Sequence, residues 1–144
     1  MSWAAVAVVT TVASAAYAGY TNYENNKYMQ KQANADAEAQ LARGRLEAER
    51  IRKEKEKAQS RARAAAAENG LDVNEGTAVV INDQIEQDAN YDANMAEITG
   101  YNSSQRLKAE ASVYGKNAQT AIVSGALNTA SSGMNTYGAT KGWK

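Results

Sequence analysis

The side chains that could do chemistry in this chain are carboxylates, lysines, serines and tyrosines, because its 144 residues include no histidine and no cysteine. Zinc sites of the usual kinds and cysteine nucleophiles are therefore excluded. No spacing assembles the remaining groups into a phosphate-binding loop, a nucleophile elbow or a glycine-rich dinucleotide fingerprint. We therefore expect no catalytic residue, no metal and no cofactor, and a protein that is not an enzyme.

The composition favours extended helices over a compact globule. The chain has a formal net charge of zero, no proline and no phenylalanine, and about a fifth of its residues are alanine. A compact core needs many large apolar side chains to offset the entropy lost when the chain is ordered. We therefore expect an all-α protein of long helices that is stabilised by oligomerisation.

Residues 1–23 form a mildly apolar N-terminal helix in which no charged side chain precedes Glu24. About twenty helical residues span about 30 Å, the thickness of the hydrocarbon core of a bilayer. Aromatic side chains at both ends of such a segment are typical of a membrane–water interface. The candidate membrane-interface residues are Trp3, Tyr17, Tyr20 and Tyr23.

The same N-terminal residues also fit an alanine-rich helix that other protein segments bury in an oligomer. Thr10, Thr11 and Ser14 dilute its apolar character. A signal peptide is disfavoured, because no basic residues precede the apolar stretch. Membrane insertion and burial by protein stay open as interpretations, and both can hold at different times.

Residues 24–69 predict one long charged helix, because they are rich in Ala, Glu, Lys, Arg and Gln, which are strong helix formers. Small residues recur in steps of four and three, a heptad pattern that lets helices approach closely but buries little area. The predicted seam positions are Ala37, Leu41, Gly44, Ala48, Ile51, Lys55, Ala58, Ala62 and Ala65.

Between Arg43 and Arg63 this helix carries nine basic and four acidic residues. A basic surface is what a nucleic-acid-binding helix presents. A solvated helix face explains the residues better, because opposite charges interleave at helical spacing, as in Glu49 with Lys53, and no aromatic side chains accompany them. We therefore expect weak or no direct binding of nucleic acid.

Residues 70–76 predict a turn between two helices. Gly70 suits the left-handed position that ends a helix. Asp72 and Glu75 have the spacing of a capping box for the next helix, and Thr77 is a second candidate cap. The candidate turn residues are Gly70, Asp72, Glu75 and Gly76.

Residues 77–114 predict a second helix whose first half is acidic, and no basic residue occurs between Arg63 and Arg106. If the chain folds back in the turn, the acidic stretch lies beside the basic stretch of the preceding helix. An antiparallel αα-hairpin then pairs opposite charges along its length. Each exposed pair contributes little, but together the pairs favour one alignment over slipped ones.

Residues 115–144 form a C-terminal segment rich in small residues, followed by a flexible tail that includes Tyr137, Gly138, Gly142 and Trp143. Small side chains four residues apart make surfaces on which helices pack closely. The candidate helix-packing residues are Ala118, Ile122, Gly125 and Ala126. A hairpin would bring this segment and the apolar N-terminal segment to the same end of the molecule.

Several motifs together resemble one family over nearly the full chain. They are Met-Ser-Trp-Ala-Ala at residues 1–5, an alanine-rich helix end with a Gly-Leu-Asp-Val-Asn-Glu-Gly-Thr turn at residues 64–77, the acidic helix after it, the pair Tyr101-Asn102, and the Ala/Gly/Ser-rich end. In these features the chain resembles the small internal virion (core or ejection) proteins of short-tailed bacteriophages.

The resemblance implies a protein that is packed inside the capsid near the portal and is ejected ahead of the genome. The ejected proteins then form a conduit through the host cell envelope, and the smallest of them forms the outer-membrane part. The implied partners are further copies of the chain, the other internal core proteins, the portal and the host outer membrane. The family's peptidoglycan-cleaving activity belongs to a larger protein, so no catalytic residue is implied here.

A purely structural role is the alternative. In that case the chain is a helical adaptor or scaffold of a virion assembly that has no membrane role. It predicts a ring or bundle in which residues 4–18 are buried by protein alone.

Overall fold

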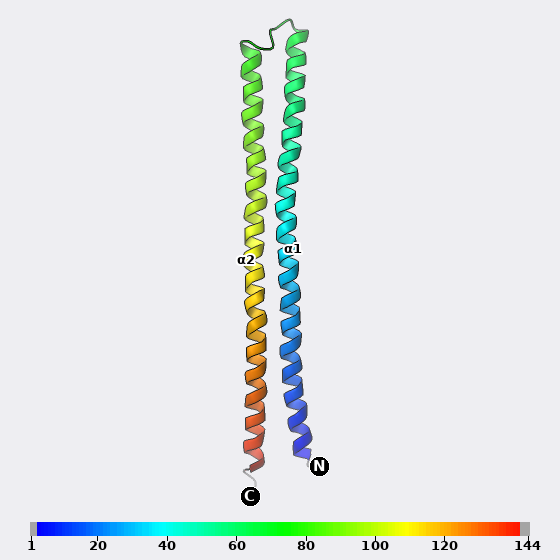
Figure 1. Cartoon of the computed structure of the whole chain (residues 1–144), viewed down its shortest axis with the longest axis vertical. Helices are drawn as coiled ribbons and strands as arrows, with labels where there is room; N and C mark the ends of the chain where they lie inside the picture. The colour runs from blue at the N-terminus through cyan, green and yellow to red at the C-terminus, as the bar shows by residue number, and fades with distance from the viewer. Residues whose placement is uncertain (1–2, 142–144) are drawn as a thin grey trace. The chain divides into compact units, whose positions relative to one another are not determined.

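The structure is a computed structural model that describes residues 3–141, with side chains described for residues 12–135. Helix α1 spans Trp3–Glu68 and helix α2 spans Thr77–Lys141. The two helices pack against each other in opposite directions, as Figure 1 shows. The prediction of an all-α chain that folds into an antiparallel helical hairpin is therefore confirmed.

Two compact units make up the chain, and each contains part of both helices. Unit 1 combines Met1–Asn34 with Lys108–Lys144, and unit 2 is Ala35–Leu107. Unit 1 therefore contains both of the weakly charged terminal stretches. Unit 2 contains the turn and most of the charged residues of both helices.

A left-handed glycine ends α1, as the sequence predicts. Gly70 has a φ of 72°. Its backbone N–H donates to the carbonyl oxygen of Ala67 at 3.0 Å, and the N–H of Leu71 donates to that of Ala66 at 2.9 Å. This pair of bonds is a Schellman motif, which satisfies carbonyl groups that the end of a helix would leave without partners.

The predicted capping box at Asp72 and Glu75 is wrong. α2 begins only at Thr77, after Gly76 with a φ of 63°, so neither Asp72 nor Thr77 holds the cap position. The Asp72 carboxylate instead accepts a hydrogen bond from the backbone N–H of Asn74 at 2.9 Å. Such a local bond offers aspartate an alternative to capping.

Replacing Gly70 with alanine is expected to destabilise the hairpin by about 1–2 kcal/mol, because an L-residue is strained in the left-handed region. Urea unfolding followed by far-UV circular dichroism measures this loss. Gly133→Ala is the control, since Gly133 lies within α2 with no neighbouring atom within 4 Å of an added Cβ. That change should stabilise the chain by up to about 1 kcal/mol. Equal effects of the two changes would contradict the assigned turn.

The compositional boundaries at residues 23/24 and 114/115 are not ends of helices. α1 and α2 run through them without interruption, and α2 continues through Tyr137 and Gly138 to Lys141. Tyr137 and Gly138 of the predicted flexible tail are thus helical, while Gly142 and Trp143 lie outside the described residues; the flexibility of this tail stays a prediction. The chain has no proline to break a helix, and strong helix formers flank its polar stretches.

The seam predicted for the charged helix is largely confirmed. Ala37, Gly44 and Ala48 are buried, and most of the other predicted positions are partly buried. Ala65 is exposed and its neighbour Ala66 is buried, so the pattern shifts by one residue in the last turns of α1. A 3.5-residue repeat drifts relative to a helix with 3.6 residues per turn, which accounts for such a shift.

Candidate functional site

Small side chains form the interface between the two helices. The buried apolar residues of the described part of the chain are all alanines, and we call this interface the alanine seam. They are Ala33, Ala37, Ala48, Ala66, Ala78, Ala93, Ala111 and Ala118. Because each alanine buries only one methyl group, the seam allows close approach of the helices but buries little apolar area.

Two facing glycines make the tightest part of the seam in unit 2. A Cβ placed on Gly44 would lie 2.9 Å from the Cα of Gly100 and 2.9 Å from the carbonyl oxygen of Ala96. A Cβ placed on Gly100 would lie 2.8 Å from the Cα of Gly44. These neighbours are backbone atoms, which cannot rotate away as a side chain can. Both positions therefore require glycine at the observed helix spacing.

The glycine pair defines the register of unit 2, in which residue i of α1 faces residue 144 − i of α2. Long side chains connect positions close to that alignment. Arg52 Nη2 donates to Glu97 Oε1 at 2.8 Å, and Gln59 Nε2 donates to the backbone carbonyl of Asn82 at 3.4 Å. These contacts and the glycine pair together oppose sliding of one helix along the other.

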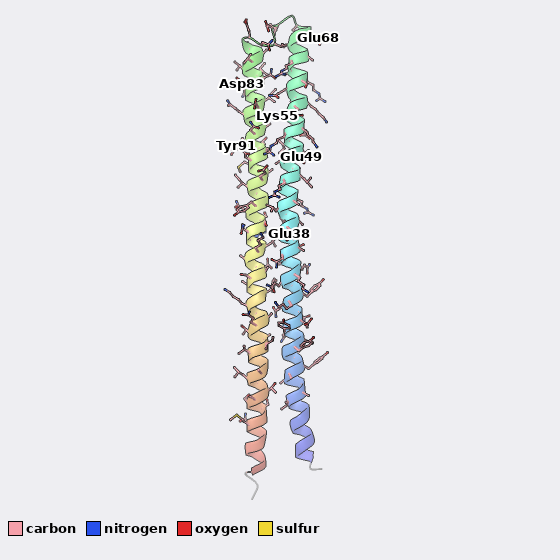
Figure 2. The ribbon with its side chains drawn as sticks, viewed as in Figure 1. Glu38, Glu49, Lys55, Glu68, Asp83 and Tyr91 are labelled. Atoms are coloured by element: carbon pink, nitrogen blue, oxygen red, sulfur yellow. The ribbon has the colours of Figure 1, made fainter. Side chains whose placement is uncertain are left out.

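The predicted pairing of the basic and acidic helices is realised between Arg52 and Glu97. Lys53 instead pairs within α1, with Glu49 at 2.8 Å. The hydrogen bond and charge of Lys53 lower the pKa of Glu49, and those of Glu49 raise the pKa of Lys53. Both side chains are exposed, so this pair adds little to stability. In Figure 2, Tyr91 of α2 lies at a height between those of Glu49 and Lys55 of α1.

In unit 2, several large apolar side chains of α2 are exposed on the face away from the seam, whereas Val79, Ile85 and Leu107 are partly buried. Four of the exposed side chains lie on one helix face, because they recur at steps of eleven, four and three residues. They are Val80, Tyr91, Met95 and Ile98. That face lies opposite the seam residues Asn82, Ala93, Gly100 and Ser104, all of which are buried. Tyr91 is 66% exposed and Ile98 is 50% exposed. We call Val80, Tyr91, Met95 and Ile98 the outer stripe of α2.

Polar side chains between and beside the outer stripe complete this face. Gln84, Gln87, Asn102 and Gln105 continue it without charge, and all four are exposed. Asp88 and Asp92 lie along one of its edges and are exposed too. The face is therefore a long, uncharged and partly apolar surface with the acidic edge of Asp88 and Asp92 on one side and the exposed Asp83 toward the other.

The outer face of α1 in unit 2 has a different character. It carries Leu46, which is 65% exposed, together with the exposed bases Arg50, Lys53 and Lys57 and the exposed acid Glu49, which pairs with Lys53. The two helices of unit 2 thus present unlike outer faces. Sequence reasoning missed this difference, although the spacing of the large apolar residues from Val80 to Ile98 carries the signal.

In unit 1, the alanine seam includes a second glycine pair. A Cβ on Gly125 would lie 3.2 Å from the Cα of Gly19. Of the four predicted helix-packing residues, Gly125 therefore faces α1, and Ala118 is buried. Ile122 and Ala126 are exposed and line a groove beside the seam.

The predicted membrane-interface aromatics do not share one environment. Tyr17 and Tyr20 are exposed, whereas Tyr23 is partly buried, with Lys27 Nζ 5.9 Å from the centre of its ring. Trp3 begins α1, and its side chain lies outside the described residues. The role of these four residues at a membrane stays a prediction.

Neither a candidate membrane span nor a candidate metal site is found among the described residues. No helical stretch among them combines the length and the apolarity that crossing a membrane requires. Within the same part of the chain, no three acidic side chains cluster in a way that could hold a metal ion. Comparison of the chain with protein-family models, with curated proteins and with solved structures finds no match.

Proposed function

We propose that this chain is an internal virion protein of a short-tailed bacteriophage, which self-associates near the portal and helps to form the conduit through the host cell envelope. The sequence resemblance supports the proposal through the N-terminal Met-Ser-Trp-Ala-Ala run and the glycine-bounded turn. The chain takes no catalytic step and needs no cofactor in this role. Its partners are further copies of itself, the other internal core proteins and the portal.

One observation carries this proposal: the fully buried apolar residues of the hairpin are alanines, and many of its large apolar residues are exposed. An isolated soluble protein rarely leaves many large apolar side chains along one face. A subunit of an assembly does so, because neighbouring subunits cover that face. The mildly apolar terminal stretches, which meet in unit 1, are the part proposed to reach the envelope.

Flotation with vesicles of phosphatidylethanolamine and phosphatidylglycerol tests the membrane role. We expect the full-length chain to float with the vesicles and release a trapped dye, and a chain that lacks residues 2–20 to do neither. Tyr17→Ser with Tyr20→Ser should weaken flotation, because both side chains are exposed aromatic anchors. Tyr28→Ser, which changes an equally exposed tyrosine of unit 1 beyond residues 1–23, is the matched control.

The opposite result would favour the structural alternative. If neither the full-length nor the shortened chain associates with lipid, including after mild acidification or detergent-assisted reconstitution, the N-terminal segment packs against protein. The chain is then a helical adaptor or scaffold of the virion with no membrane role.

A further inference from the structure

We propose that the outer stripe of α2 is covered by the outer face of α1 from a second copy of this chain. The inference concerns unit 2 and deepens the self-association that is part of the proposed function, on which it rests. Val80, Tyr91, Met95 and Ile98 are available for this contact, because the hairpin's own seam uses only the opposite face of α2.

Charge selects α1 of the neighbour over α2 as the helix that docks. Asp88 and Asp92 lie along one edge of the outer stripe, and a second α2 offers no basic side chain between residues 77 and 105 to meet them. The outer face of α1 instead presents Arg50, Lys53 and Lys57. Arg50 also pairs with Glu47 and Lys53 with Glu49 on their own helix, so Lys57 is the base whose ion pairing within α1 does not compete with the contact. The acidic edge also disfavours an anionic lipid surface as the occupant.

The register of the hairpin brings matching residues to the same level. When two hairpins lie side by side in the same orientation, α2 of one runs antiparallel to α1 of the next, as it does to its own α1. The alignment in which residue i faces residue 144 − i then places Ile98 against Leu46 and Tyr91 against Lys53. An apolar side chain meets an apolar one, and an ammonium group meets an aromatic ring.

The acidic edge matches the basic face in the same alignment. Asp88 lies one residue from the level of Lys57, and Asp92 lies two residues from the level of Arg50. Viewed along the helix axes, these four side chains lie on the same edge of the contact. Seen from one end, successive residues of two antiparallel helices turn in opposite directions. Residues that lie a little further round each facing surface therefore meet at the same edge. One alignment therefore satisfies the apolar and the charged groups together.

Such a contact joins two different surfaces, so each copy keeps one of each kind free for the next. Contacts of this kind build a closed ring when the rotation between neighbours closes, and an open array when it does not. A twofold contact of α2 with α2 would stop at a dimer.

Cysteine cross-linking tests the contact directly, because the chain has no cysteine of its own. Ile98→Cys and Leu46→Cys are made as separate variants, mixed, and oxidised or treated with a short bis-maleimide. The mixture should give a covalent dimer, and the double variant should give a ladder of higher oligomers. Neither single variant alone should cross-link efficiently.

Val80→Cys mixed with Leu46→Cys is the matched control. Val80 lies on the same outer stripe as Ile98, but 18 positions, or about 27 Å, further along the helix. It should therefore give little product with Leu46→Cys. Circular dichroism of each variant checks that the hairpin stays helical.

Two outcomes would overturn the inference. Efficient cross-linking of Ile98→Cys with itself would show that α2 pairs with α2, and no product in any mixture would show that the outer stripe does not bind a second copy. These outcomes are separate from the proposed role in the envelope, which flotation tests. A chain that cross-links as proposed but ignores lipid keeps this contact and loses the membrane role.

Discussion

Gly100→Leu is expected to destabilise the hairpin by about 3 kcal/mol or more, the upper range for forcing a larger side chain into a packed interface. Its Cβ would lie 2.8 Å from the Cα of Gly44 and 2.9 Å from the carbonyl oxygen of Gln40. Because both are backbone atoms, α1 and α2 must separate around this level. The neighbouring seam contacts of Ala48 and Ala93 are then lost as well.

Whether Gly100→Leu lowers or raises the free energy of unfolding distinguishes close helix contact at this site from the helix propensity of leucine. Leucine is a better helix former than glycine by about 0.8 kcal/mol, so an unconstrained site gains stability from the change. Gly133→Leu provides that site. Urea unfolding at one fixed protein concentration compares the two variants, since association also shifts apparent stability. A stability of Gly100→Leu at or above that of the unchanged chain would refute the close approach at Gly44.

Ile98→Glu is expected to raise the dissociation constant for self-association about ten- to a hundredfold while the hairpin stays folded. Burial of an isoleucine side chain contributes about 1.5–3 kcal/mol, and each 1.4 kcal/mol changes an affinity tenfold. The added carboxylate has no role in the seam, because Ile98 is half exposed on the far face of α2. Sedimentation equilibrium measures the constant.

Two further variants make the result specific to the outer stripe. Asn90→Glu adds the same charge to an exposed position of α2 outside the stripe, and it should leave association nearly unchanged. Leu46→Lys should restore part of the association of Ile98→Glu, because it places a base opposite the new acid. If Asn90→Glu is as disruptive as Ile98→Glu, the net charge of α2 and not the stripe controls association.

The fold followed from the sequence where local chemistry determines the backbone. Gly70 could be assigned to the end of the first helix because glycine alone adopts the left-handed conformation without strain. The spacing of Ala37, Gly44 and Ala48 gave the buried face of that helix, since helical periodicity fixes which residues share a face. The change from basic to acidic residues across the turn predicted the antiparallel pairing.

Other features depended on tertiary contacts that composition does not reveal. The boundaries at 23/24 and 114/115 follow changes in charge and polarity, whereas a helix continues wherever a neighbouring helix supports it. The Asp72 carboxylate could either cap the next helix or accept a hydrogen bond from the nearby backbone. Because α2 begins only at Thr77, the carboxylate accepts from the N–H of Asn74. The pairing of Gly44 with Gly100 needed the register, which neither residue specifies alone.

The outer stripe was not predicted, because its residues lie on the surface where a core is not expected. Large apolar residues usually form the core of a protein. Here the seam takes alanine and glycine, so the larger side chains are left on the outside. A helix with one small-residue face and one large-residue face is suited to two different contacts at once.

Unfolding this hairpin transfers little apolar surface into water, because the apolar side chains that it buries fully are alanines and larger ones, such as Ile51 and Ile85, are only partly buried. The heat-capacity change of unfolding arises mainly from the hydration of newly exposed apolar surface, and about 12–15 cal/mol/K per residue is typical of globular proteins. A chain whose buried apolar side chains are alanines falls below that range. Its free energy of unfolding therefore changes only gently with temperature, so the hairpin loses little stability in the cold.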